Sequence, residues 1–189
     1  WACITNILRM NISYNNFDML EIGYGINLRQ LATLAEKTYW DDPCTAFAPH
    51  VLDRNQYDPV DETLAAKMHK VIAICQFKAE GQRILAHPEY KLDDRLLLDK
   101  IDYKAGTIEI EGKKYKLRDT NFPTIDPMDP YKFTCEEEGM MNSLEASILQ
   151  SDKLQTHIKF LYSHGKKKKK VNGNLLYHGC IPMTKDGEF

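Results

Sequence analysis

The sequence predicts an α+β fold that is mostly helical, with one small hairpin in its middle and a second β element at its C-terminal end. Three observations support this prediction. Apolar residues recur at helical spacing over five segments of the chain. Two short alternating runs flank a Glu111-Gly112 turn. An Asn172-Gly173 pair, a strong hairpin signal, separates two strand-like runs near the end.

The first expected helix covers residues 2–13 and places Ile4, Ile7 and Leu8 on one face. The run from 15 to 25 that follows it is rich in turn-forming residues. Its two glycines form a G-x-G pair but lack the third glycine and the preceding strand of a phosphate-binding loop. We therefore predict an ordinary loop here.

Asn27 is a suitable N-cap for a second helix that continues through Trp40. Asp41-Asp42-Pro43 ends this helix, because proline disfavours helical conformation in the residue before it. The segment 44–60 has no periodicity and is expected to be a surface loop. The apolar stripe of the helix consists of Leu28, Leu31, Leu34 and Ala35.

Asp61 is expected to cap the longest helix, which runs to about Leu85 before His87-Pro88 ends it. Its buried side is expected to include Leu64, Met68, Val71, Ile72, Cys75 and Phe77.

The second half of the chain begins with the strands 107–110 and 115–117, followed by an extended connector with three prolines. Thr134 and Glu137 have the spacing of a capping box for a helix to about Gln150. Ser151 is expected to cap a further helix, which Gly165 closes. A single terminal hairpin is marginally stable in water, so the last strands are expected to pair with a larger sheet.

Composition excludes several functional classes. The chain has 189 residues, 43% of them apolar, and a net charge of −2, which favours neither a nucleic-acid nor an anionic-lipid partner. It has no apolar run long enough to span a membrane. Its five cysteines are widely spaced, odd in number and without a C-x-x-C pair, as expected of reduced thiols in a cytoplasmic protein.

His178 is the main candidate for chemistry. It follows an apolar strand and precedes Gly179, and a strand end can present a metal ligand rigidly while glycine permits close backbone approach. From spacing alone, a lone histidine at this place is more often structural. The remaining histidines have no partner at metal-ligand spacing and are expected to be structural or exposed: His50, His69, His87, His157 and His164.

Several blocks of the sequence agree in order and spacing with one enzyme family. They are Tyr24–Arg29, Asp94–Tyr103, Asp119–Pro127, Leu154–Tyr162 and the Leu-Leu-Tyr-His-Gly-Cys-Ile-Pro run Leu175–Pro182. The last run is similar to the histidine-glycine block of the metallophosphatase superfamily. Together the blocks resemble the class III fructose-1,6-bisphosphatase of Firmicutes and some other bacteria, over the whole chain.

The resemblance implies a function for a longer parent protein. That protein would hydrolyse the 1-phosphate of fructose 1,6-bisphosphate, a sugar phosphate, in gluconeogenesis. Its binuclear site, with Mn²⁺ as the implied metal, would use His178 as one ligand. The other metal-binding blocks of the family do not occur here, so the chain is expected to be an internal piece that is inactive by itself and has the remainder of the parent as its partner. No sugar-binding residue and no oligomeric state are predicted.

The resemblance also implies a domain organisation. Residues 1–165 would be a largely helical region inserted in or framing the catalytic domain, and 166–189 a strand–turn–strand piece of a metallophosphatase-type sheet sandwich. One departure is the run Lys166–Lys170, where the family has a mixed strand. It is either an exposed strand edge that lysine protects from aggregation or an error in the recorded sequence.

Two rival functions remain open from the sequence. The chain would be a non-enzymatic helical interaction or regulatory module if His178 is structural. It would belong to a phosphoprotein phosphatase if only the histidine-glycine block carries the relationship. The helical blocks favour the sugar phosphatase.

Overall fold

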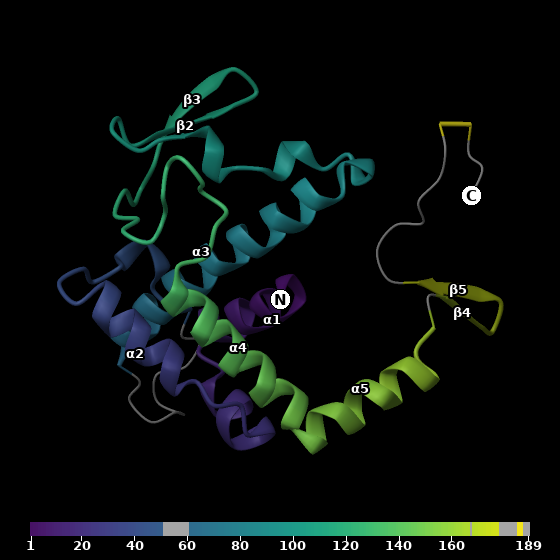
Figure 1. The fold of residues 1–189 in the computed structure, drawn as a ribbon. Coiled ribbons are helices and arrows are strands. Elements are labelled where there is room, and N and C mark those ends of the chain that lie inside the picture. The colour runs from purple at the N-terminus through teal and green to yellow at the C-terminus, as the bar shows by residue number, and fades with distance from the viewer. Residues whose placement is uncertain (51–60, 167, 178–184, 187–189) are drawn as a thin grey trace. The chain divides into compact units, whose positions relative to one another are not determined.

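The computed structural model describes residues 1–50, 61–166, 168–177 and 185–186, and it divides into two compact units (Figure 1). The first unit is Trp1–Ser151 and the second is Asp152–Phe189. The first contains α1 (Ala2–Ser13), a π-helix (Met19–Gly23), α2 (Arg29–Thr38), α3 (Glu62–Ala86), β1 (Ile101–Asp102), β2 (Thr107–Ile110), β3 (Lys113–Lys116) and α4 (Cys135–Gln150). The second contains α5 (Asp152–His164), β4 (Lys168–Val171) and β5 (Asn174–Tyr177).

The mostly helical α+β class is confirmed. The described strands form a three-stranded sheet in the order β1-β2-β3 and a separate β4–β5 pair, both antiparallel. The sheet sandwich and the roles of the two predicted domains in a catalytic core stay predictions. The compact units divide after Ser151, one helix earlier than the boundary at 165 that the sequence suggested.

Helix α3 is the centre of the first unit, and α1 and α2 both pack against it (Figure 1). Its side chains are buried on most sides, so its apolar residues show little one-sided periodicity. The expected buried face is right for Met68, Val71, Ile72 and Cys75 but wrong for Phe77, which is 41% exposed. The buried face of α1 also differs from the expected one, since Leu8 and Ile12 are buried while Ile7 is exposed.

Two of the predicted helix caps, Asp61 and Thr134, form as expected. The Asp61 carboxylate accepts hydrogen bonds from the N–H groups of Thr63 and Leu64, at 3.0 and 3.1 Å. Thr134 and Glu137 form the predicted capping box in full. These caps satisfy N–H groups that have no partner within the helix, so the local sequence was sufficient to identify these two helix starts.

Helix α2 departs from its predicted bounds at both ends. Its N-cap residue is Leu28, although the Asn27 side chain still accepts a hydrogen bond from the Arg29 N–H at 2.9 Å. The helix ends at Thr38 rather than Trp40, since Tyr39 has a non-helical backbone with φ −123° and ψ 39°. Tyr39 is buried, whereas Trp40 is 75% exposed.

The loop expected at 15–25 is instead helical over most of its length, with residues 17–24 in α or π conformation. Leu20 is the buried residue of this segment. Phe17, Leu20 and Tyr24 have the 3–4 spacing of a helical face, a signal that the glycines obscured. Gly25, at φ 69°, provides the turn that leads out of it.

The central hairpin forms at the predicted turn. Glu111 and Gly112 both have positive φ, 50° and 74°, as a type I′ turn requires. Strand β3 covers Lys113–Lys116 and therefore ends one residue before the predicted limit at Leu117. Strand β1 adds a third strand that was not expected, because its two residues are too few to show alternation.

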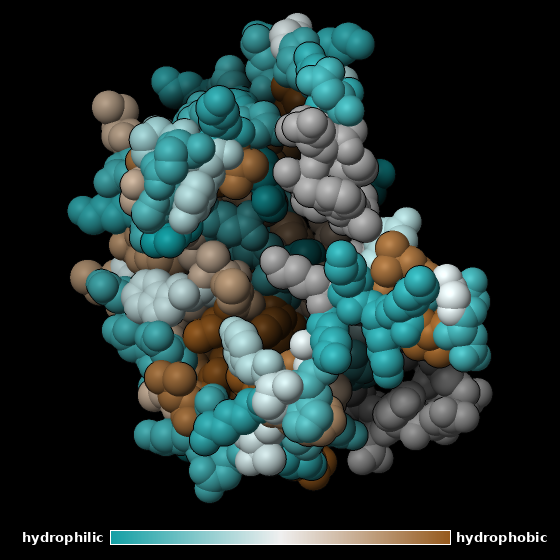
Figure 2. All heavy atoms as spheres, turned by 90° about the vertical axis from the view of Figure 1, so that its right-hand side faces the viewer, coloured by the Kyte–Doolittle hydropathy of each residue, from teal (hydrophilic) through white to brown (hydrophobic). Residues whose placement is uncertain are grey.

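The second unit has the predicted helix and hairpin. Gly165 follows α5 and donates its N–H to the Leu161 carbonyl at 2.7 Å, and Asn172-Gly173 forms the turn between β4 and β5 with φ of 50° and 82°. All residues of both strands are exposed, including three apolar ones on β5. Apolar side chains also reach the surface elsewhere, as brown areas among teal in Figure 2.

An ion pair joins α3 to the start of α4 in the interior of the first unit. The Lys78 ammonium group is fully buried and lies 2.6 Å from Glu137 Oε2. It also donates to the Thr124 carbonyl at 2.6 Å, and the same Glu137 oxygen accepts the Thr134 N–H. The carboxylate therefore serves both the helix cap and the buried cation.

This double role predicts that Glu137→Ala is strongly destabilising. The substitution leaves a buried ammonium group without its carboxylate, which lowers the free energy of unfolding by about 3–5 kcal/mol. Glu138→Ala is the matched control, because Glu138 is the exposed next residue, and it should change stability by less than about 0.5 kcal/mol. Urea unfolding of the two variants measures the difference, and equal losses would contradict the role given to Glu137.

The exposed β4–β5 pair predicts uneven hydrogen exchange in this chain. Amides of β5 should exchange about a hundredfold faster than those of α3, since an opening easier by about 3 kcal/mol gives that ratio. Exchange followed by mass spectrometry or NMR tests this. Protection of residues 174–177 equal to that of α3 would mean that the hairpin is packed within the chain.

Candidate functional site

The predicted metal ligand His178 lies outside the described residues. The residues before it in the sequence form strand β5, which is described as far as Tyr177. The role of His178 as a metal ligand stays a prediction. Among the described residues, no group of three or more histidine, cysteine, aspartate or glutamate side chains could hold a metal ion.

Three of the other histidines have local partners of their own. His69 Nδ1 lies 2.9 Å from the Phe47 carbonyl oxygen, and burial lowers the pKa of this histidine. His87 pairs with Glu89 at 2.8 Å, and His164 stacks on Phe160 within α5. These contacts agree with structural or surface roles.

A polar cluster, here called the Lys70 cluster, consists of Lys70, Asp42, Asp119 and Asn121. The Lys70 ammonium group is fully buried and lies 3.0 Å from Asp42 Oδ2 and 2.7 Å from Asp119 Oδ2. Asn121 donates to Asp42 Oδ2 at 2.8 Å. The Tyr39 ring faces the ammonium group at 4.3 Å. Helix α3 thereby holds two loops that are far apart in sequence.

The cluster keeps Asp42 ionised. Burial raises the pKa of this carboxyl group, but hydrogen bonds from the Cys44 N–H, Lys70 and Asn121 outweigh burial and lower the pKa to about 2. Two carboxylates thus face one ammonium group, and the aromatic ring covers a further side of it. We infer that Lys70 is a structural cation, because its charge is compensated and its nitrogen is closed to solvent.

Neighbouring groups are unsuited to nucleophilic chemistry at neutral pH. Burial raises the pKa of the Cys44 thiol to about 12, so it stays protonated and is a weak nucleophile. Burial also raises the pKa of the Tyr39 hydroxyl, and that oxygen is buried without a hydrogen-bond partner within the described part of the chain. The cluster therefore offers neither a thiolate nor a phenolate.

A polar recess of about 410 Å³ borders the cluster. Asp42, Asp119 and Asn121 belong both to its wall and to the cluster, and their hydrogen bonds to Lys70 and to one another leave few groups directed to a ligand. The other lining residues are Asp41, Pro43, Thr45, Ala46, Arg118 and Thr120.

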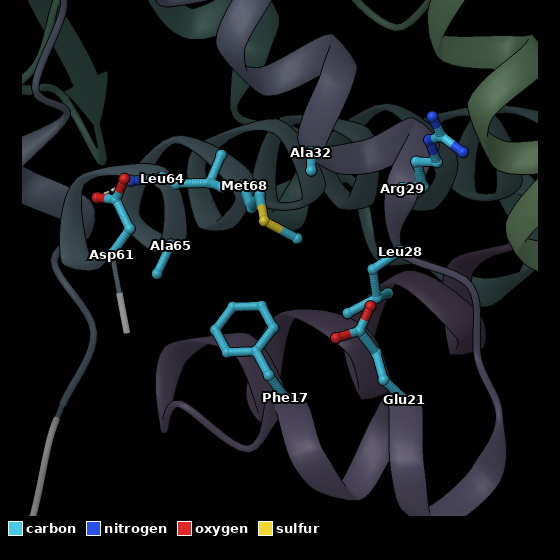
Figure 3. Close-up of a pocket in the computed structure, with 9 residues that line it drawn as sticks. All are labelled: Phe17, Glu21, Leu28, Arg29, Ala32, Asp61, Leu64, Ala65 and Met68. Atoms are coloured by element: carbon cyan, nitrogen blue, oxygen red, sulfur yellow. Dashed lines mark hydrogen bonds between the residues drawn. The ribbon is translucent and has the colours of Figure 1, made fainter. Parts of the chain in front are cut away.

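A second cavity of about 290 Å³ has apolar walls (Figure 3). Phe17 and Met68 point into it from the helical 17–24 segment and from α3, and Glu21 and Arg29 lie at its edge. The Asp61 carboxylate at the cavity is engaged in the α3 cap. The remaining lining residues are Leu28, Ala32, Leu64 and Ala65.

Sequence reasoning missed the buried lysines. Lys67, Lys70, Ile74 and Lys78 follow one another at intervals of three and four residues, so they lie on one face of α3. That face contains an apolar residue and is therefore not a purely polar, solvent-facing one. That pattern could have identified them. Their partners come from segments distant in sequence, which no local pattern could supply.

The low pKa of Asp42 predicts a loss of stability in acid. The folded-state pKa lies below the usual 3.8, so its contribution is present above about pH 4 and is lost as the pH falls through about 2. Asp42→Asn should lower the free energy of unfolding by about 1.5–3 kcal/mol at pH 7. It should also flatten the acid limb, which is the fall in the free energy of unfolding between about pH 4 and pH 2.

Asp41→Asn is the matched control, because Asp41 is the exposed preceding residue and should leave both stability and the acid limb nearly unchanged. Urea unfolding at several pH values measures both variants. An acid limb in Asp42→Asn as steep as in the unchanged protein would contradict the assignment.

Comparison with known proteins extends over the full chain. The family model described as Firmicute fructose-1,6-bisphosphatase matches residues 1–189. The chain is 54% identical over 188 residues to fructose-1,6-bisphosphatase class 3 of Clostridium tetani, covering 100% of this chain and 28% of that protein. The proteins of the same name from Alkaliphilus metalliredigens and Listeria innocua are 52% and 50% identical, each over 100% of this chain.

The chain thus spans less than a third of these relatives, covering 28% and 29% of the last two proteins. No solved structure matches it significantly. The family match includes every sequence block on which the resemblance was based, from Tyr24 to Pro182. The chain belongs to the Firmicute fructose-1,6-bisphosphatase family.

Proposed function

We propose that the protein carrying this chain hydrolyses the 1-phosphate of fructose 1,6-bisphosphate, giving fructose 6-phosphate and inorganic phosphate, in gluconeogenesis. The observation that supports this is the 49–54% identity, along nearly the whole chain, to proteins named fructose-1,6-bisphosphatase class 3. Because the chain covers less than a third of those proteins, the reaction is proposed for the longer protein and the chain alone is expected to be inactive.

The metal requirement rests on the sequence resemblance. We assign His178 as one ligand of a binuclear site of the metallophosphatase type that holds Mn²⁺. When bound, such a metal pair holds the phosphate and lowers the pKa of a water molecule. The same resemblance assigns the further ligands to other parts of the longer protein.

The role proposed for this chain's own residues is positional. As a ligand, the His178 imidazole must be neutral, and its second ring nitrogen must donate to an acceptor that fixes the ring. A strand directly before the histidine restricts its backbone, and Gly179 after it permits close approach to metal or substrate. The helical unit would frame the site.

A sheet of the metallophosphatase type in the longer protein would account for the exposure of β5. Its three apolar residues, Leu175, Leu176 and Tyr177, are 50–54% exposed, which is unusual for consecutive residues of a strand. We propose that the remainder of the longer protein covers this strand.

The proposed location is the cytoplasm. Four cysteines lie in the described residues, and all four are free thiols: Cys3, Cys44, Cys75 and Cys135. Reduced thiols are typical of that compartment. No described helix has the length and apolar content needed to cross a membrane.

The ligand role of His178 predicts the effect of two histidine substitutions in the full-length protein. His178→Ala should lower kcat at least about a hundredfold and raise the Mn²⁺ concentration needed for activity, because loss of a ligand weakens metal binding and misplaces the attacking water. His157→Ala is the control. It removes an imidazole that is exposed on α5, and it should change kcat less than about twofold.

Phosphate release at several Mn²⁺ concentrations measures both variants, and circular dichroism checks that they fold. Small and equal effects of the two substitutions would show that His178 is structural and would remove the basis for a metallophosphatase site in this chain.

A further inference from the structure

We propose that a pocket on the first unit, here called the arginine pocket, binds a small dianion of the phosphate class. The pocket has a volume of about 470 Å³, within the range of small-ligand sites. Arg9 of α1, Arg83 of α3 and Arg95 of the short 3₁₀ helix Asp93–Arg95 line it. Three segments distant in sequence therefore each contribute an arginine to the lining of one hollow.

The net positive charge of the lining residues favours an anionic ligand. Glu80 is the acidic residue among the lining residues, so three guanidinium groups and one carboxylate leave an excess of two positive charges. A phosphate or phosphate monoester carries nearly two negative charges at neutral pH. Its oxygens match the planar, paired N–H donors of arginine, which bind phosphate in bidentate fashion.

A hydrogen-bonded network holds two of the three arginines in place. The Gln76 side chain accepts from Arg9 Nε at 2.6 Å and donates to Glu80 Oε1 at 2.7 Å. The other Glu80 oxygen accepts from Arg95 at 3.3 Å. Glu80 thus connects two of the three arginines through one carboxylate. Preformed polar networks of this kind reduce the entropy lost on binding.

The rim adds further donors and shape. Tyr90 receives a hydrogen bond from Arg83 at 3.4 Å, and the guanidinium carbon lies 6.0 Å from the ring centre. Asn6 accepts from Gln76 at 3.4 Å and supplies a second amide to the wall. The apolar part of the lining consists of Ala2, Cys3, Ile84 and Leu92. The proposed ligand class therefore includes phosphate esters with a small organic group as well as inorganic phosphate.

The test uses the full-length protein and inorganic phosphate as the probe. Phenylglyoxal modifies accessible arginines, and peptide mass spectrometry reports the rate at each one. Phosphate should slow modification of Arg83 and Arg95, both exposed, in a saturable way and about tenfold when its concentration is ten times Kd. Arg29 and Arg118 are internal controls outside the pocket, and sodium chloride at equal ionic strength is the buffer control.

Variants assign the effect to the pocket. Arg9→Gln should abolish the protection of Arg83 and Arg95, while Arg118→Gln should leave it unchanged. Circular dichroism checks folding. If Arg9→Gln does not fold, Arg83→Gln provides the same test with Arg95 as the reporter.

Three outcomes would overturn the proposal. Equal protection by chloride, or equal protection of Arg29 and Arg118, would indicate general screening of charge. Unchanged protection in the folded pocket variants would place the phosphate elsewhere. Arg83 and Arg95 that do not react even without phosphate would show that another part of the protein covers the pocket, so that no small anion reaches it.

Discussion

The burial of ammonium groups on α3 is the constraint on which the first unit depends. Lys67, Lys70 and Lys78 lie on the central helix and are at most 5% exposed. A buried charge is tolerated only when it is paired and hydrogen-bonded. Each lysine therefore requires acceptors from outside α3, and those acceptors come from α2, from the loop after it, from the segment 119–124 and from the start of α4.

These lysine–carboxylate pairs determine how the helices and loops of the first unit pack on α3 more than they add to the free energy of unfolding. Taking a lysine and a carboxylate out of water costs about as much as their attraction returns, whereas removing one partner leaves an uncompensated charge. An alternative packing of α2 or α4 on α3 would leave at least one ammonium group unpaired. The same demand explains why Glu137 belongs at once to a capping box and to an ion pair, and why loops at Asp42 and Asp119 meet at Lys70.

The two units contribute differently to the proposed chemistry. The first is held together by its own core and carries a charged pocket that its sequence did not reveal. The described part of the second contains a helix without buried residues and a hairpin in which no strand residue is buried, and in sequence it precedes the histidine on which the metal proposal rests. The family relationship connects the chain with sugar-phosphate hydrolysis, and the arginine pocket adds a phosphate-class ligand on independent physical grounds.

The sequence by itself determined the features whose causes are local. The caps at Asp61 and Thr134 and the two turns with positive φ follow from neighbouring residues, and the family follows from ordered sequence blocks. Only the tertiary structure decided the partners of the three lysines, the helical form of 17–24, the pairing of β1 and the convergence of Arg9, Arg83 and Arg95. Those features depend on contacts between segments distant along the chain, where packing and the pairing of buried charge outweigh local preference.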